Sequence, residues 1–265
     1  MTRILSLSDL HCGNVSGLTP DRFNPDSEVG HKMHLYRAAL YHWVTQEIDK
    51  LRPIDICVVN GDAIDGKGDK NGGLEQFTVD RTAQIEMAVE FCKWINAKEY
   101  HFTYGTAYHV GHEDDWENEV AIEFGTRPEP IIELNIHGLI MKWRHHSGGS
   151  AIFAARANAL ARQQLNDILW AVEGEERRAD VLVYSHQHYF YVTMNRFGTT
   201  FVSPALQGFG GSQLGTRRMG GVTDYGFLHF DVNSKDDWSW KLHRLLQTKR
   251  VRSGELLVPS QAPAR

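Results

Sequence analysis

Four groups of residues in this sequence have side chains that bind metal ions, and each group follows a short apolar run. Carboxylate and imidazole together are typical ligands of divalent transition metals. The carboxyl ends of neighbouring strands meet at one edge of an α/β sheet, where such folds place their sites. We therefore predict that the four groups form one metal centre. Their members are, in chain order, Asp9, His11, Asp62, Asp65, His145, His146, His186 and His188.

The spacing inside the first and last groups supports this prediction. Asp9-x-His11 and His186-x-His188 each place two ligands one residue apart. On a strand or its extension, residues i and i+2 point to the same side, so both members of a pair can face one ion. Each pattern alone is common in turns. Four of them, each after an apolar run, indicate a metal site.

The elements that must position these groups are readable from hydrophobic periodicity. Alternation and short apolar runs predict strands at 4–7, 56–59, 101–104, 181–184, 189–194, 199–203, 227–232 and 238–242, with a hairpin over 131–144. Apolar residues spaced by three and four predict helices over 36–51, 85–95, 116–124 and 153–172. This alternation of strand, loop and helix implies parallel pairing and a layered α/β fold.

The order of the motifs resembles that of the calcineurin-like metallophosphoesterases. The resemblance covers about residues 3–232 and rests on Asp9-x-His11, Gly61-Asp62-x-x-Asp65 and His186-x-His188. It implies a four-layer αββα sandwich in a single domain, in which two β-sheets pack face to face between helices. It also implies two divalent ions at the strand ends.

The resemblance assigns a ligand set motif by motif. By this resemblance, the first ion is held by Asp9, His11 and His188. Asp62 bridges both ions. The second ion is held by His186 and by either His145 or His146. The two adjacent histidines point to opposite faces of a strand, and a slip of one residue in the pairing exchanges them. Both therefore stay candidates.

The middle motif departs from the family pattern, which is Gly-Asn-His followed by Asp or Glu. In the family, the Asn binds the second ion and the His assists the leaving group. Here Gly105-Thr106-Ala107-Tyr108-His109 has no Asn and two additional residues. This Gly-Thr-x-x-His form resembles that of phage-encoded members. We expect His109 to take the family His role or to replace the Asn, and Thr106 to offer an oxygen to an ion or the substrate. His112, which precedes Glu113, is the rival to His109.

The implied centre would hydrolyse phosphoesters. Two divalent ions about 3.5–4 Å apart clamp a phosphoryl group and lower the pKa of a bridging water, which attacks phosphorus as hydroxide. Asp62 would keep the ions together as the bridging carboxylate. His109 would protonate the leaving oxygen. The mixed imidazole and carboxylate ligands fit Mn²⁺, our first choice, and also Fe, Zn or Ni.

We expect a phosphodiester substrate, with DNA or RNA favoured by the phage-like resemblance and by modest basic patches. Arg156, on the helix that follows Gly148-Gly149-Ser150, is a candidate phosphate contact. The alternatives are a phosphomonoesterase, a small-nucleotide phosphodiesterase and a catalytically degenerate scaffold that keeps the fold. A zinc hydrolase on another fold is a further alternative, with a single ion held by three ligands.

Composition limits the remaining classes. The 265 residues are 42% hydrophobic and 23% charged, which is ordinary globular usage, and the net charge of −5 excludes a wholly basic nucleic-acid coat. Three cysteines cannot form a disulfide framework and favour a reducing compartment. No apolar run reaches the roughly 20 residues of a membrane helix, and the N-terminus does not resemble a secretory signal. We expect a cytoplasmic protein without membrane contact, with one domain over 1–248 and a flexible tail over 249–265. The sequence makes no prediction of oligomeric state.

Overall fold

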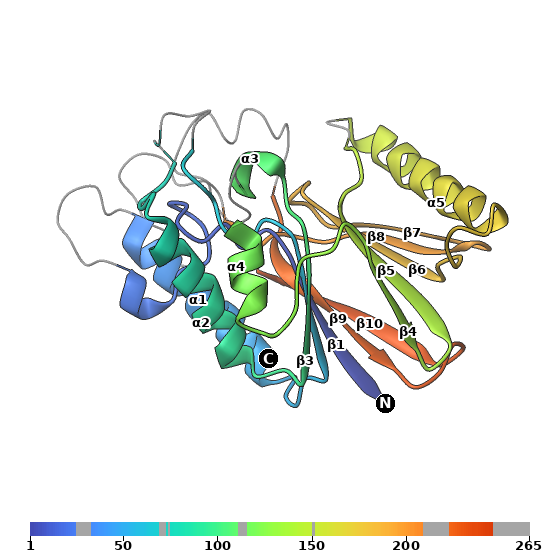
Figure 1. Cartoon of the computed structure of the whole chain (residues 1–265), viewed down its shortest axis with the longest axis horizontal. Helices are drawn as coiled ribbons and strands as arrows, with labels where there is room; N and C mark the ends of the chain where they lie inside the picture. Colours follow the sequence, from blue (N-terminus) through green and yellow to red (C-terminus); the bar gives the residue numbers. More distant parts are fainter. Residues whose placement is uncertain are drawn as a thin grey trace, which may run out of the picture.

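Two mixed β-sheets of five strands each pack face to face between two layers of helices in the computed structural model of this chain (Figure 1). The structure describes residues 1–24, 33–68, 73, 75–110, 116–149, 152–208 and 223–245. The four-layer αββα sandwich that we expected, in a single domain, is confirmed. The domain boundary at residue 248 and the tail over 249–265 lie outside the described residues.

The first sheet has the strand order β10-β9-β1-β2-β3. Strands β1, β2 and β3 are parallel, whereas β9 runs antiparallel to both β1 and β10. The bounds are Thr2–Leu7 for β1, Ile56–Asn60 for β2, Glu99–Thr103 for β3, Tyr225–Val232 for β9 and Trp238–Leu245 for β10. All five strands were expected from their apolar residues.

The second sheet has the order β4-β5-β6-β8-β7. Its central strands β5, β6 and β8 are parallel, and β4 and β7 are antiparallel edge strands. The bounds are Ile132–Ile136 for β4, Leu139–His146 for β5, Val181–Ser185 for β6, Tyr191–Asn195 for β7 and Gly198–Val202 for β8. The expected hairpin over 131–144 is the β4–β5 pair.

Helices cover the outer face of each sheet (Figure 1). Against the first sheet lie α1 (His34–Asp49), α2 (Arg81–Ile95) and α4 (Trp116–Ile122). Against the second sheet lies α5 (Arg156–Val172), and the single turn α3 (Ala107–Val110) follows β3. Short 3₁₀ turns cover Asp21–Phe23 and Phe153–Ala155.

Successive side chains along the strands of the first sheet point to opposite faces and so pack into two cores, one on each side of the sheet. Residues Ile4, Val58 and Phe230 point toward the second sheet and pack with Met141 and Trp143. Their sequence neighbours point the other way. Because residues i and i+1 of a strand face opposite sides, a strand apolar at every position is buried on both faces.

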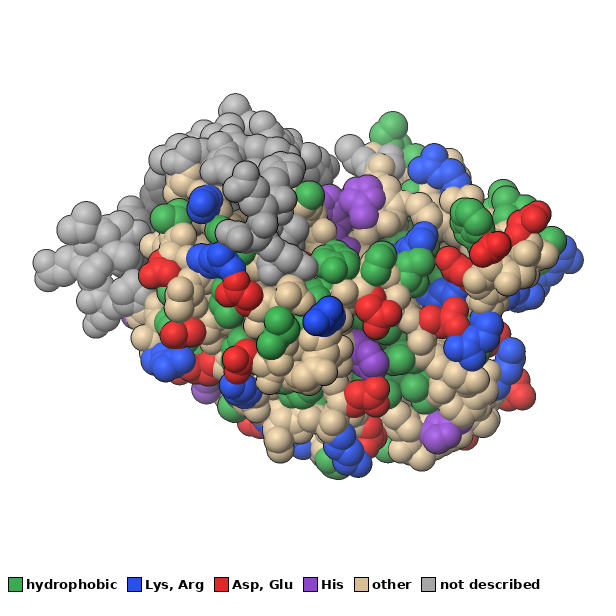
Figure 2. All heavy atoms as spheres, viewed as in Figure 1, with side chains coloured by type: hydrophobic (Ala, Val, Ile, Leu, Met, Phe, Trp, Pro, Cys, Tyr) green, Lys and Arg blue, Asp and Glu red, His purple; other side chains and the backbone are tan. Residues whose placement is uncertain are grey.

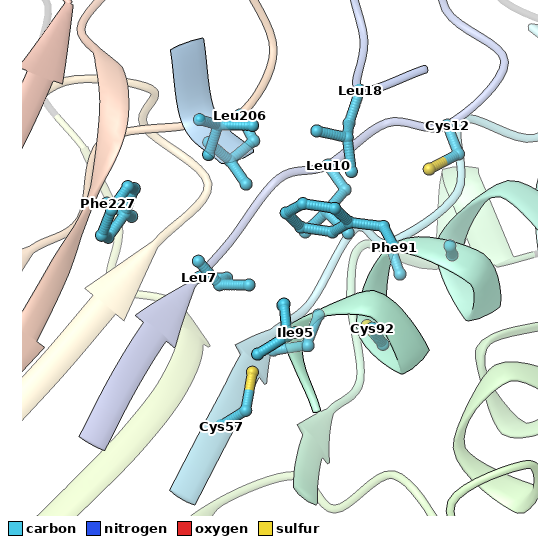
Figure 3. Packing of buried hydrophobic residues seen from close by; sticks show 14 of the residues in the cluster. Leu7, Leu10, Cys12, Leu18, Cys57, Phe91, Cys92, Ile95, Leu206 and Phe227 are labelled. Atoms are coloured by element: carbon cyan, nitrogen blue, oxygen red, sulfur yellow. The ribbon is translucent and has the colours of Figure 1, made fainter. Parts of the chain in front are cut away.

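The core on the helix side is shown in Figure 3, where Leu7 and Cys57 lie on the side of their sheet that faces α2. Phe91 and Ile95 of α2 pack into the same cluster. All three cysteines are free and buried, as Cys12, Cys57 and Cys92. They serve here as small apolar side chains.

Helix α5 presents a different face to its sheet than the sequence predicts. We expected one apolar face that included Phe153, Leu165 and Val172, but these side chains are exposed. The buried positions are instead Leu160, Gln164 and Asp167. The reason is electrostatic, because Asp167 accepts a hydrogen bond at 2.7 Å from buried Lys142 of β5. Leaving the buried ammonium group of Lys142 unpaired would cost more free energy than exposing these apolar side chains to water.

The described helices include no membrane-spanning candidate, since none combines the necessary length with sufficient apolar character.

Candidate metal centre

Seven side chains selected from the sequence lie together where β1, β2, β5 and β6 end. Their ligand atoms form three overlapping groups, and within each group all atoms lie within 4.8 Å of one another. The groups are Asp9 with Asp62, His145 and His186; Asp9 with His11 and His188; and His11 with Asp62 and His109. Asp9, His11 and Asp62 thus each belong to two groups.

These side chains are oriented by turns after the strands. We expected straight extensions of the strands instead. Five residues have left-handed backbone conformations, with φ of 51° at Asp9, 46° at His11, 52° at Asp62, 69° at His186 and 53° at His188. Non-glycine residues rarely adopt positive φ, and such strained positions concentrate at functional sites. Asp9 and His11 share one ligand group as expected, whereas His186 and His188 belong to different groups.

The loops after β1 and β2 run side by side and hold each other. The backbone N–H of Asp9 donates to Gly61 O at 3.0 Å, and that of His11 donates to Asp62 O at 2.9 Å. Gly61 has a φ of +73°, and a Cβ there would meet the His145 ring at 2.4 Å. Only glycine fits at this position, because both the backbone conformation and the neighbouring ring exclude a side chain.

The first group contains three facing ligand atoms. His188 Nε2 lies 3.1 Å from Asp9 Oδ1, and His11 Nε2 lies 3.9 Å from the same oxygen. The two imidazole nitrogens are 3.3 Å apart. All three side chains are at most 5% exposed.

These atoms fit a cation. Asp9 Oδ1 is buried and has no hydrogen-bond partner among the described residues, which is costly for a carboxylate. Ligand atoms 2.0–2.2 Å from a tetrahedral ion lie about 3.3–3.6 Å from one another. The observed separations of 3.1, 3.3 and 3.9 Å bracket that range. A transition-metal ion would satisfy the orphaned oxygen and both nitrogens.

Asp65 stands behind His11 and fixes which ring nitrogen faces the centre. His11 Nδ1 donates to Asp65 Oδ1 at 2.8 Å, and Asn14 Nδ2 donates to the other carboxylate oxygen at 3.0 Å. Nε2 therefore carries the lone pair that a metal ion requires. Burial opposes protonation of His11, but the hydrogen bond and charge of Asp65 outweigh it and raise the pKa to about 9.

Asp62 lies between the first group and the second. Its Oδ2 is 2.9 Å from His145 Nε2 and 3.8 Å from His186 Nδ1. The same oxygen is 3.9 Å from His11 Nε2 in the first group. A carboxylate oxygen in this position can contact ions in both groups, which is the bridging role that the resemblance implies.

Thr106 completes the second group. Its Oγ1 lies 3.0 Å from His186 Nδ1, 3.3 Å from His145 Nε2 and 3.2 Å from Asp62 Oδ2. Its backbone N–H donates to Asp62 Oδ1 at 2.6 Å. The residue that follows Gly105 where the family motif has Asn thus faces the atoms of the second group.

His145 reaches the centre through a contact between the two sheets. Its Nδ1 donates to Asn60 O at 2.8 Å, so Nε2 faces Asp62. Asn60 also donates from Nδ2 to Arg144 O at 3.1 Å, which joins the ends of β2 and β5. Burial disfavours a charged His145, yet the carboxylates of Asp62 and Asp9 prevail and raise its pKa to about 10.

His146 lies outside the three groups. Its side chain is exposed, and its Nδ1 accepts a hydrogen bond from the Gly148 N–H at 3.1 Å. Its ring centroid is 4.7 Å from that of His186. Of the two adjacent histidines, the structure therefore brings His145 and not His146 among the converging atoms.

His109 lies on the side of the first group. Its ring centroid is 4.7 Å from that of His11, and its Nδ1 donates to Asp65 O at 2.8 Å. His109 belongs to the group with His11 and Asp62, whereas Thr106 lies against the second group. The rival residue His112 and its neighbour Glu113 lie outside the described residues.

Arg156 lies at the start of α5, beside the centre rather than in it. Its guanidinium carbon is 3.6 Å from the ring centroid of Tyr189, the residue after His188. Its Nε is buried and has no hydrogen-bond partner among the described residues.

Sequence reasoning missed Glu117, which ties together the loops that carry Asp62 and Thr106. This side chain is buried in α4, and its two oxygens accept hydrogen bonds from the Ala63 N–H, at 2.9 Å, and from the Gly105 N–H. Burial and the charge of Asp62 raise the pKa of Glu117 to about 7. The sequence did offer a signal: Glu117 is a single charged residue on the apolar face of the predicted helix, the face that includes Val120.

Comparison with known proteins gives matches in structure alone. No family model matches the sequence, and no curated protein does. Vps29 from Entamoeba histolytica, complexed with Zn²⁺, is 12% identical, with a TM-score of 0.51 over 94% of this chain and 95% of that one. Vps29 from Cryptosporidium parvum is 12% identical, with a TM-score of 0.47 over 92% and 97% of the two chains. An archaeal phosphodiesterase is 11% identical, with a TM-score of 0.46 over 91% and 100%. The likeness to the Entamoeba protein spans nearly all of both chains and shows that this chain has the fold of the calcineurin-like metallophosphoesterases.

Proposed function

We propose that the protein is a metal-dependent phosphoesterase that holds two divalent ions and hydrolyses phosphodiesters, with DNA or RNA as the favoured substrate. The observation that carries the proposal is the position of Asp62 Oδ2, which lies between the imidazole nitrogens of two buried ligand groups. A structural role gives no reason to gather so many ligand atoms at one buried point, where Asp9 Oδ1 has no hydrogen-bond partner among the described residues.

The two groups would divide the ions between them. Asp9, His11 and His188 would hold the first ion, and His145 and His186 with the Thr106 hydroxyl would hold the second. Asp62 would contact both. When bound, the ions would neutralise charge on the phosphoryl oxygens and supply an activated water.

His109 would move a proton during the reaction. Because Nδ1 donates to the backbone carbonyl of Asp65, the exchangeable proton of the charged ring is on Nε2. A histidine beside the ions protonates the departing oxygen or stabilises charge on it in the transition state. The Gly-Thr-x-x-His form of the motif would in this way keep the histidine function without the Asn.

An open pocket favours a diester over a monoester. It has a volume of about 310 Å³ and shares Thr106 and His145 with the second group. A phosphodiester carries a second substituent on phosphorus, and the pocket leaves space for it beside the ions.

The nitrogen and oxygen ligands favour Mn²⁺, with Fe, Zn or Ni as alternatives. Three free, buried cysteines support a reducing compartment, and we propose the cytoplasm.

The test is hydrolysis by metal-stripped protein of bis-p-nitrophenyl phosphate and of p-nitrophenyl phosphate, with Mn²⁺, Zn²⁺ or Mg²⁺ restored separately. The proposal expects diester cleavage that depends on Mn²⁺ and disappears in Asp62→Asn. Preference for the monoester would replace the diester assignment with a phosphomonoesterase. Diester cleavage that Asp62→Asn retains would refute the role of this centre.

A second candidate is a protein that binds metal without hydrolysis. The observation that favours it is Thr106, because a neutral hydroxyl is a weaker ligand than an amide oxygen. Stoichiometric metal binding without turnover of either ester or of a short oligonucleotide would support this candidate.

A further inference from the structure

The open pocket beside the second ligand group has a wall that the proposed reaction does not use. Its lining combines the loop after β3 and Pro130 with the end of β5; the residues are Tyr104, Gly105, Thr106, Pro130, Arg144, His145 and His146. Figure 2 shows histidine side chains at the surface between the regions of α3 and α5, with hydrophobic and basic side chains nearby. The volume of about 310 Å³ is at the lower end of the range of small-molecule sites.

Arg144 gives this pocket a positive charge. Its side chain is half-buried, and among the described residues no ion pair or hydrogen bond involves its guanidinium. Lys142, two residues earlier on β5, contrasts with it because it pairs with Asp167 and Glu176, each at 2.7 Å. A guanidinium with its donors unused matches the oxygens of a phosphate in a bidentate contact.

Tyr104 and Pro130 supply an exposed apolar surface at the same pocket. Tyr104 is 40% exposed, directly after β3. Its position is fixed by the backbone, because its N–H donates to Glu129 O at 3.1 Å. Exposed aromatic rings beside a basic group are the usual elements that bind single-stranded nucleic acid, where the ring stacks on a base.

We propose that this pocket binds the nucleotide next to the scissile phosphodiester, with its base on Tyr104 and its phosphate on Arg144. The inference rests on the proposed function and names the chemical class of its substrate. Thr106 and His145 lie both in the pocket wall and in the second ligand group. A nucleotide in the pocket therefore adjoins the reacting phosphate.

Binding without turnover tests the pocket separately from the reaction. The probe is thymidine 3′,5′-bisphosphate, titrated calorimetrically into metal-stripped protein. We expect Arg144→Ala to weaken binding at least tenfold and Tyr104→Ala to weaken it about fivefold. Tyr104 is exposed, so its variant tests the proposal even if Arg144→Ala does not fold. The matched control is Arg196→Ala, which removes an exposed guanidinium from the turn between β7 and β8.

Substrate preference gives the second readout. Dithymidine monophosphate is compared with its forms phosphorylated at the 5′ or the 3′ end, using Mn²⁺-loaded protein. We expect the wild type and Arg196→Ala to prefer one phosphorylated form, and Arg144→Ala to lose that preference. Equal effects of Arg144→Ala and Arg196→Ala on binding and on preference would overturn the inference. Cleavage of bis-p-nitrophenyl phosphate in that case would leave the proposed function intact, so the two failures are distinguishable.

Discussion

At the scale of single residues, two of the candidate histidine ligands, His11 and His145, are oriented by the partner of their other ring nitrogen. Asp65 accepts from His11 Nδ1, and Asn60 O accepts from His145 Nδ1. Such outer partners fix the tautomer and make the facing nitrogen a better ligand. The motif Gly61-Asp62-x-x-Asp65 showed that Asp65 belongs to the site. It did not show that Asp65 acts through a histidine, because that depends on the turns.

Substitution of Asp65 tests this arrangement. Asp65→Asn keeps the shape of the side chain but removes the charge that His11 faces. We expect metal affinity to fall about 10–100-fold, measured by competition with a chromogenic chelator. Asp236→Asn removes an exposed carboxylate elsewhere and should leave the affinity unchanged. An unaltered affinity in Asp65→Asn would mean that His11 needs no such partner.

Protons should leave the site when metal binds. In the metal-free protein the pKa of His11 is about 9 and that of His145 about 10, so both rings are charged at pH 7. An ion requires the neutral ring, so affinity should rise with pH up to about 10, the pKa of His145. Calorimetry in buffers of different ionisation enthalpy should detect proton release at pH 7, with less release from His145→Ala. A binding enthalpy independent of the buffer contradicts the raised pKa values.

At the scale of elements, hydrophobic periodicity predicts every strand and the four longer helices. It places the ligand groups at strand ends. It does not predict the left-handed turns, because periodicity carries no information on φ and even Asp and His, which are enriched at positive φ, adopt it in a minority of cases. It also misjudges the buried face of α5, where Lys142 of a neighbouring strand selects Asp167. Both errors arise from contacts between segments distant in sequence, which local periodicity does not contain.

Helix α4 offers a test through Glu117. Its pKa of about 7 exceeds the ordinary value of 4.5, so the folded protein binds this proton more tightly than the unfolded chain. The stability that Glu117 contributes is therefore full below pH 4.5 and is lost as the pH rises to 7. Glu117→Gln cannot lose a proton. In metal-free protein at pH 8 we expect it to be more stable than wild type by up to about 3 kcal/mol, measured by urea unfolding.

The same substitution should reduce activity. The two oxygens of Glu117 accept hydrogen bonds from the backbone N–H groups of Ala63 and Gly105 and so hold the loops beside Asp62. A glutamine has one acceptor oxygen and can accept only one of these hydrogen bonds. We expect diester hydrolysis to fall about tenfold or more. Glu123→Gln, on the exposed side after α4, is the control and should alter neither quantity. Wild-type activity in Glu117→Gln would show that the loops do not need this residue.

At the scale of the whole molecule, the centre joins the two sheets. Its ligands follow β1 and β2 of the first sheet and β5 and β6 of the second. Bound ions would therefore link both halves of the sandwich. The sequence predicted the sandwich through resemblance, since pairing of distant strands cannot be read from local patterns.

Metal removal should consequently lower thermal stability. An ion present at 1,000 times its Kd adds about 4 kcal/mol to the free energy of unfolding. For a domain of this size that corresponds to a rise in Tm of about 10 °C. Differential scanning calorimetry with and without a chelator measures it, and Asp62→Asn should show a smaller difference. Identical Tm values under both conditions would mean that no ion binds the folded state preferentially.

The most direct measurement is a crystal structure of the Mn²⁺-loaded protein with anomalous data at the manganese edge. The account predicts two anomalous peaks about 3.5–4 Å apart. One should contact His11 and His188, the other His145 and His186, and Asp62 should contact both. A single peak, or peaks away from these side chains, would contradict the two-ion centre.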